Sequence, residues 1–465
     1  MTPLVPVAMF GWIPLGLSLF WMLPVRKAIV AAYLIGWLFL PQASYAIAGL
    51  PDYTRMTAVN GVILLGLLLV DGRRLVGFRP LVWDLPMLIW CLCPLPTSIS
   101  NDLGLYDGLS GNLEQFLTWG APYWIGRVYF CDLRSIRLLA IGIFVGGLVY
   151  MPLCWFEIRM SPQLYGVFYG DPWARFYTTW RLGGYRPVVF LVHGIELGTW
   201  MCATALTGFW LWRSRTMRRL ADLRVSWLAT ALLVTAVMCR SLNALATLAI
   251  GLSALIVVKR LRFRYALLVL FLVPAGYVAL RAPQVWHPTV LIELAASIDK
   301  ARAASFQSRV DQEEILVGRA WERPVFGWGS WGRNRVRDEM GDAVTVTDSL
   351  WIITFGQQGL VGLISLGLAF ALPAILLWRR LKAQDWSSPK FAAPAVLAVC
   401  ITMYATDCLM NAMLNPIYHI LMGAVLGVAV QPYLEHAPAI NIARSPCVQR
   451  NSGVVLAHRR KARGA

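Results

Sequence analysis

Long apolar stretches recur along almost the whole chain. Each is close to the roughly 20 residues that a helix needs to cross the hydrocarbon core of a membrane. Lipid offers the backbone no hydrogen-bond partners, so stretches of this length are restricted to helices, which satisfy their own peptide groups. Only 14% of the 465 residues are charged, whereas about 25% is usual in soluble domains. The sequence therefore predicts an all-α, polytopic transmembrane helix bundle.

A sliding window of about 20 residues predicts about 12 to 14 spans. Residues 1–281 hold the earlier spans and an outer loop at 157–186, and residues 282–347 form one large polar loop containing short helices. Residues 348–434 hold the last spans, and we expect the basic tail at 435–465 to be disordered. The predicted spans are 5–23, 28–47, 56–70, 82–99, 112–130, 136–156, 187–211, 226–240, 242–258, 265–281, 349–378, 391–410 and 416–434.

Positive charge alternates from loop to loop. Under the positive-inside rule the basic loops are cytoplasmic. The N-terminus and the 157–186 and 282–347 loops are then on the outer side of the membrane, and the C-terminus is cytoplasmic. The net charge of +18 comes in short clusters between spans, so we expect the lipid bilayer as a partner and no nucleic acid. The basic segments are 26–27, 73–79, 134–137, 213–224, 259–264, 379–382 and 459–463.

The 282–347 loop is rich in arginine, which supplies all of its basic residues except Lys300. Arginine is preferred where a planar oxyanion is held by two parallel N–H groups. Residues 291–322 are expected to form one helix, which Pro324 ends. The loop closes on Asp348, directly before an apolar run. Aspartate in this position is typical of a helix N-cap, but partial burial would also make it a base for a sugar hydroxyl.

Two ionisable residues lie where the sequence predicts membrane, and such residues are functional candidates because they are costly in lipid. Arg240 lies between two adjoining spans, either snorkelling to the interface or facing outward towards an anionic lipid head group. Glu196 follows His193 by three residues on one helical face. The two form either a structural pair or a contact for a proton or a sugar hydroxyl. The spacing of Cys91 and Cys93 lacks further ligands nearby, so we expect no metal and no cofactor.

Four features resemble the O-antigen ligase and O-antigen polymerase superfamily of bacterial envelope glycan enzymes. One is the layout, a dozen or so spans with a large loop between late spans. The segment CRSLNALA at 239–246 is similar to an arginine-bearing element between two adjoining spans. The segment 308–329 is similar to a loop with an arginine and then a Pro-x-x-Gly-x-Gly turn. The segment 348–363 resembles an element that opens with His-Asn, but Asp348 and Ser349 occupy those positions here.

The resemblance implies a metal-independent glycosyltransferase of the bacterial inner membrane. Its donor is a glycan on undecaprenyl pyrophosphate and its acceptor is a glycan hydroxyl at the periplasmic face, with other polysaccharide assembly or export proteins as partners. The Asp-for-His exchange favours an exopolysaccharide polymerase or a divergent ligase. The resemblance implies that Arg240 and Arg309 hold the pyrophosphate and that Asp348 orients or deprotonates the acceptor. Further substrate-binding candidates are Arg186, Arg319, Arg323, Glu196 and Trp328.

Two other functions stay open from the sequence. A transporter or flippase of lipid-linked sugars would contain inverted repeats and paired broken helices, and neither is visible in the sequence. A non-catalytic scaffold of a polysaccharide export complex is the other alternative, and it gains weight from the missing family histidine.

Overall fold

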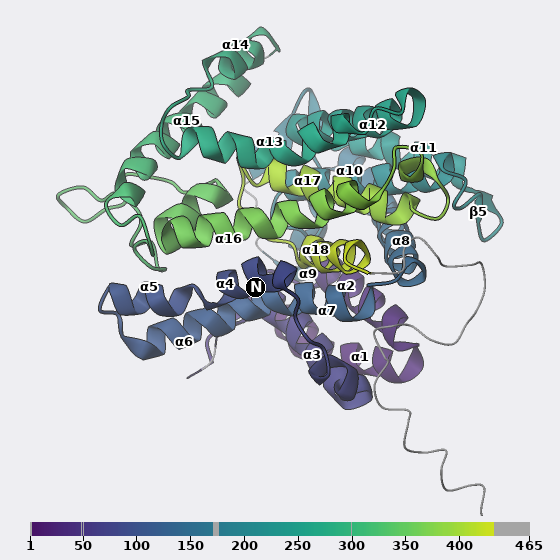
Figure 1. Ribbon diagram of the computed structural model, residues 1–465, viewed down its shortest axis with the longest axis horizontal. Coiled ribbons are helices and arrows are strands. Elements are labelled where there is room, and N and C mark those ends of the chain that lie inside the picture. Colours follow the sequence, from purple (N-terminus) through teal and green to yellow (C-terminus); the bar gives the residue numbers. More distant parts are fainter. Residues whose placement is uncertain (1, 48, 50, 171–175, 299, 432–465) are drawn as a thin grey trace, which may run out of the picture.

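The protein is mostly helical (Figure 1), as the sequence predicts. The computed structural model describes residues 2–47, 49, 51–170, 176–298 and 300–431, so the predicted tail at 435–465 lies outside the described residues. The strands of the described residues form three antiparallel two-residue hairpins. They are β1 (Ser44–Tyr45) with β2 (Tyr53–Thr54), β3 (Trp180–Arg181) with β4 (Gly184–Tyr185), and β5 (Arg219–Leu220) with β6 (Leu223–Arg224).

The described residues of the first half of the chain form twelve helical segments up to the β3–β4 hairpin. They are α1 (Leu4–Met22), α2 (Val25–Phe39), α3 (Arg55–Val76), η1 (Val82–Asp84), α4 (Leu85–Leu92), α5 (Pro94–Ser100), α6 (Gly104–Gln115), η2 (Phe116–Gly120), α7 (Ala121–Tyr129), α8 (Leu133–Met160), α9 (Leu164–Tyr169) and η3 (Phe176–Thr179).

The second half contains the longest helix, α16, and the helices of the polar loop. Its segments are α10 (Gly194–Arg213), α11 (Val225–Met238), α12 (Leu242–Leu261), α13 (Tyr265–Arg281), α14 (Thr289–Ile298), α15 (Lys300–Trp321), α16 (Leu350–Arg380), η4 (Asp385–Ser387), α17 (Ala392–Asp407) and α18 (Pro416–Ala429).

Several helices are long and apolar enough to cross a membrane. Among the described residues these are α1, α8, α12 and α16, and α4 with α5 makes a fifth if that bent pair is one span. Between 28% and 50% of the most apolar window of each of the four is buried within the protein, so the remaining surface is free to face lipid. Shorter apolar helices are α11, α13, α17 and α18. The total number of spans stays a prediction.

Helices α17 and α18 form the centre of the bundle, with almost every residue buried. A helix that is apolar all round belongs inside a bundle and not at its surface. Helix α18 lies directly against α7, where Gly126 and Gly423 leave room for close backbone contact. Small residues at such positions are typical of helices packed within a membrane.

The stretch 291–322 is helical, as expected, in α14 (Thr289–Ile298) and α15 (Lys300–Trp321), and residue 299 between them lies outside the described residues. Helix α15 buries Val310 and Leu316 against the rest of the protein, whereas α14 leaves Val290 and Leu294 exposed at 71% and 60%. The two helices therefore have different surroundings.

The polar loop lies at one end of the molecule, beside α5, α6 and the start of α16 (Figure 1). The basic β5–β6 hairpin lies at the opposite end of the long axis. That these two ends lie on opposite sides of a membrane, as the alternation of loop charges predicts, stays a prediction. Which end faces the periplasm stays a prediction.

Candidate functional site

Helix α16 is interrupted at Gly359, where φ is 64° and ψ is −162°. Such a break leaves backbone amides and carbonyls without their helical partners. A turn of the polar loop at residues 324–329, called the glycine turn below, supplies these partners. Four backbone hydrogen bonds join the segments: Trp328 N to Gly356 O (2.9 Å), Gly329 N to Gln357 O (2.9 Å), Leu360 N to Pro324 O (2.7 Å) and Val361 N to Val325 O (3.3 Å).

Glycine is required on both sides of this joint. Gly327 has a φ of 70°, and a Cβ atom there would lie 2.5 Å from the carbonyl carbon of Gln357. Gly359 has a backbone conformation that is essentially restricted to glycine, and a Cβ atom there would overlap the backbone of Val325. The Pro-x-x-Gly-x-Gly turn noticed in the sequence and the span that begins after Asp348 therefore form a single joint.

A second broken helix contacts α16 beside this joint. Helices α4 and α5 are bent by 43°, and between them Cys93 Sγ donates to Gln358 O at 3.7 Å. The spans predicted over 82–99 and 349–378 are therefore broken and not continuous. Broken backbone is tolerated at membrane depth when it is buried in protein that supplies partners. Helix α5 also holds the glycine turn, through Thr97 Oγ1 to Phe326 O (2.8 Å) and Asn101 Nδ2 to Gly327 O (2.9 Å).

Two of the predicted site residues, Arg309 and Asp348, lie together in the structure. Arg309 Nε is 3.6 Å from Asp348 Oδ2, and the same guanidinium donates to Met410 O (2.8 Å) and Asn411 Oδ1 (3.1 Å). The Asp348 side chain is 48% exposed. The alternative interpretation of Asp348 as a helix cap is wrong, because Ser349 occupies the N-cap position of α16. The Asp348 carboxylate is instead open to solvent beside a cation.

Glu313, one helical turn after Arg309 on α15, is a buried carboxylate that the sequence reasoning missed. Its Oε1 accepts from Ser349 Oγ (2.6 Å) and Trp351 Nε1 (3.0 Å), and its Oε2 accepts from the Tyr277 hydroxyl (3.0 Å). Burial raises the pKa of Glu313, and its hydrogen bonds oppose that rise. Glu313 thus ties α13, α15 and α16 together. Its only sequence signal was the spacing of four residues from Arg309, which places both on one helical face.

The motif at 239–246 reaches the ion pair through three polar side chains. Asn243 Nδ2 donates to Asp407 Oδ1 at 2.5 Å, and the same oxygen accepts from Asn411 Nδ2 at 3.0 Å. Asn411 in turn accepts from Arg309. These contacts connect two segments that the family resemblance had singled out separately. The two asparagines carry no charge and lie in apolar surroundings, so nothing in the sequence pointed to them.

Arg240 itself contacts the β3–β4 hairpin. Its Nη1 donates to the carbonyl oxygens of Arg181 (2.8 Å) and Leu182 (2.5 Å). Arg186, which follows β4, is buried, and its Nη2 donates to Ser241 Oγ at 3.2 Å. Arg186 therefore lies against the turn that carries Arg240, and that turn is joined to the ion pair by the asparagine contacts.

The sequence suggested that Glu196 pairs with His193, but in the structure its partner is Arg55. Its Oε1 is 3.8 Å from Arg55 Nη2 and accepts from Trp37 Nε1 at 3.2 Å. Its Oε2 accepts from the backbone amide of Val192 at 3.1 Å. With both side chains almost completely buried, Glu196 balances the charge of a buried cation.

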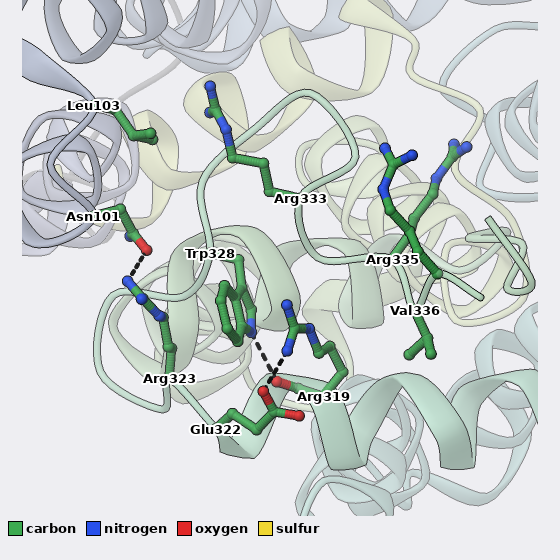
Figure 2. Close-up of a pocket in the computed structure, with 10 residues that line it drawn as sticks. Asn101, Leu103, Arg319, Glu322, Arg323, Trp328, Arg333, Arg335 and Val336 are labelled. Carbon is green, nitrogen blue, oxygen red and sulfur yellow. Dashed lines mark hydrogen bonds and ion pairs between the residues drawn. The ribbon is translucent and has the colours of Figure 1, made fainter. Parts of the chain in front are cut away.

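The remaining predicted residues, Arg319, Arg323 and Trp328, lie together around the end of α15 (Figure 2). The two guanidinium carbons are 3.4 and 4.4 Å from the centroid of the Trp328 ring, and Figure 2 shows them on opposite sides of the indole. Trp328 therefore orients two arginines, and its faces are not free to stack on a sugar. These residues line a pocket of about 560 Å³, called the arginine pocket, together with Arg333, Arg335 and Arg337.

An apolar groove of about 520 Å³ lies between α13, α16 and α17. Leu350 and Trp351 line it and directly follow the Asp348–Ser349 dipeptide. Cys408 and Leu409 also line it, and they directly precede the segment that accepts from Arg309. Leu350 N donates to Cys408 O at 3.0 Å. The groove therefore adjoins the Arg309–Asp348 pair, which we call the reaction site below.

Comparison with models of known protein families gives no match, and neither does comparison with curated protein sequences. Among the described residues, no three His, Cys, Asp or Glu side chains are grouped so that they could hold a metal ion.

Proposed function

We propose that this protein is a bacterial envelope glycosyltransferase of the polymerase or ligase type. It moves a glycan from undecaprenyl pyrophosphate to an acceptor sugar hydroxyl at the periplasmic face of the inner membrane. The observation that carries the proposal is the junction of an apolar groove with a cation–carboxylate pair. A donor of this class has the same two parts, a long apolar chain and a doubly charged head group.

The groove is suited to the first isoprene units of the donor lipid. Its lining is almost entirely apolar, and one of the helices that form it, α16, has surface free to face lipid. A chain lying along α16 towards Leu350 reaches the segment where Arg309 is held. The pyrophosphate then meets a guanidinium group, which forms short charge-assisted hydrogen bonds with phosphate oxygens.

The residues at the reaction site can support the transfer without a further group. The acceptor oxygen attacks the anomeric carbon of the donor sugar, a new C–O bond forms, and the bond from that carbon to the pyrophosphate oxygen breaks. The electron pair leaves with the pyrophosphate, and Arg309 stabilises the developing negative charge. Arg186 and Arg240 on the adjoining segments add positive potential. Asp348 takes the proton of the acceptor hydroxyl.

The test is transfer by purified protein from a lipid-linked donor to a labelled acceptor. We expect Arg309→Ala to slow transfer about 100-fold or more, the usual cost of removing a group that stabilises the leaving charge. Asp348→Ala and Arg240→Ala are expected to slow it as well. Asp311→Ala is the matched control, because it removes an exposed carboxylate from the same helix. Wild-type rates from the first three variants would exclude this assignment.

One observation favours a second function, the transport of lipid-linked sugars. Paired broken helices are typical of transporters, and the breaks of α4–α5 and α16 are in contact through Cys93 and Gln358. Transfer measured in detergent separates the two functions, because detergent-solubilised protein has no membrane across which to move a lipid. Movement of a labelled lipid-linked glycan across liposomes, with no transfer in detergent, would identify a transporter.

A further inference from the structure

The arginine pocket concentrates positive charge that the protein itself does not neutralise. Five guanidinium groups line it, and the only acid among the lining residues is Glu322, which pairs with Arg319. A second carboxylate, Asp107, is 3.8 Å from Arg333. The other three arginines have no carboxylate partner among the residues that the structure describes.

The contacts of these three arginines are neutral. Arg323 donates to the side chain of Asn101, and Arg337 Nη1 donates to Gly341 O at 2.7 Å. The side chain of Arg335 is exposed and makes no hydrogen bond or ion pair within the described ranges. Neutral partners do not lower the positive potential, so the pocket attracts anions.

Two of the five arginine groups are held in place before any ligand arrives. Trp328 lies between Arg319 and Arg323 (Figure 2), and its Nε1 donates to Arg319 O at 2.8 Å. The glycine turn that carries Trp328 is fixed to α16 by backbone hydrogen bonds. A guanidinium group held in this way loses little freedom when it binds a planar oxyanion.

The arginine pocket is separate from the reaction site. Arg309 and Arg319 are ten residues apart on α15, which is about 15 Å along a helix at 1.5 Å per residue. One pyrophosphate group cannot reach both. A growing glycan can, since it is a long chain attached to the reacting carbon.

We propose that the arginine pocket binds acidic sugars of the glycan through their carboxylate groups. This inference rests on the proposed function and names the substrate class, a polyanionic glycan. The planar fork of arginine matches a carboxylate with two parallel N–H groups, and the volume of about 560 Å³ falls in the range of roughly 300–1,000 Å³ that is usual for small-ligand pockets. Several arginines in one pocket suit a chain that carries a charge on successive repeats.

The test measures binding directly, with purified protein in a neutral detergent. The probes are a galacturonic acid trisaccharide and the galactose trisaccharide of the same linkage. The variant is Arg335→Gln combined with Arg337→Gln, two exposed side chains outside the protein core. The matched control is Arg215→Gln with Arg218→Gln, in an arginine-lined pocket of about 380 Å³ on the β5–β6 segment.

We expect wild-type protein to bind the acidic trisaccharide and not the neutral one, with affinity that falls as salt rises. The pocket variant is expected to bind about 10-fold more weakly, which is about 1.4 kcal/mol, and the control variant to bind like wild type. Equal binding of the two sugars, or equal loss in the control variant, overturns the proposal.

A competition arm separates sugar carboxylate from phosphate as the natural ligand. Inorganic pyrophosphate is expected to bind more weakly to Arg309→Ala and unchanged to the pocket variant. Loss of pyrophosphate binding in the pocket variant instead would assign the pocket to the donor head group and overturn the proposal. Acid-sugar binding without any transfer activity would leave the pocket standing and remove the proposed function, so the two failures are distinguishable.

Discussion

Replacing Gly359 with alanine tests the joint between α16 and the glycine turn. Gly359 has a φ of 64° and a ψ of −162°, a conformation that costs a residue with a side chain about 1–3 kcal/mol. The added Cβ would also overlap the backbone of Val325 and lie 2.7 Å from Phe326 N. Backbone atoms held by hydrogen bonds cannot swing aside as the end of a flexible side chain can. The turn must therefore separate from the helix.

Separation of the turn breaks the four backbone hydrogen bonds that join it to α16. Each contributes about 0.5–1.5 kcal/mol net, and more if one partner stays buried. Together with the conformational strain, we expect a loss of roughly 3–9 kcal/mol. Proteins are stable by about 5–15 kcal/mol in total, so a single methyl group at this position removes a large part of the stability.

The assay is thermal unfolding of purified protein in detergent, followed by tryptophan fluorescence. Gly367→Ala in the same helix is the matched control, because no atom lies within 4 Å of its Cβ position. We expect this control to keep or slightly raise the melting temperature, since alanine favours a helix by about 1 kcal/mol over glycine. Gly359→Ala is expected to melt several degrees lower. Equal melting temperatures for the two variants would refute the conclusion that Gly359 is required for the contact between α16 and the glycine turn.

Three further predictions concern stability and are measured by the same assay. Burial raises the pKa of Glu313 above that of an ordinary glutamate, which is about 4.3. The protonated Glu313 carboxyl therefore stabilises the fold at pH values below about 4.3, and this stabilisation is lost as the pH rises through the raised pKa. The melting temperature of wild type minus that of Glu313→Gln should therefore fall with rising pH, and a constant difference contradicts this. Arg127 Nε lies 2.6 Å from Asp84 Oδ1, so Arg127→Ala leaves the Asp84 carboxylate buried without its ion-pair partner and should lower the free energy of unfolding by about 3–5 kcal/mol. Replacing Arg127 and Asp84 together by leucine should lower it much less. Gly423→Val should separate α7 from α18, because a Cβ there overlaps the backbone of Tyr123; an unchanged melting temperature would exclude that contact.

The general character of the fold follows from hydropathy, but the breaks in its helices do not. Apolar stretches predicted a mostly helical chain, and this is confirmed. Among the described residues, four or five helices are long and apolar enough to cross a membrane. The break at Gly359 was missed because glycine is common in membrane helices, and hydropathy is the same for a broken helix and a continuous one. What permits the break is a turn some thirty residues earlier, whose backbone groups contribute nothing to any hydropathy window.

The site was partly predictable because the family resemblance singled out one arginine in the polar loop and the aspartate at its end. Arg309 and Asp348 were selected from the sequence, and the structure places them 3.6 Å apart. Glu313 was not selected, since a charged helix in a polar loop gives no sign of which carboxylate is buried. Glu196 was paired with His193 by its spacing, but its partner is Arg55, from a distant part of the chain.

Helix α15 connects the reaction site to the arginine pocket. Near its middle, Glu313 is bonded to α13 and α16 through Tyr277 and Trp351. At its end, Trp321 Nε1 donates to Ala282 O at 2.8 Å. A helix fixed at both points cannot bend or slide without breaking buried contacts, so the separation of about 15 Å along it is constant. An acidic sugar bound in the pocket then lies at a set distance from the bond being formed. This fixed distance would let the protein select glycans by the position of their charge as well as by its presence.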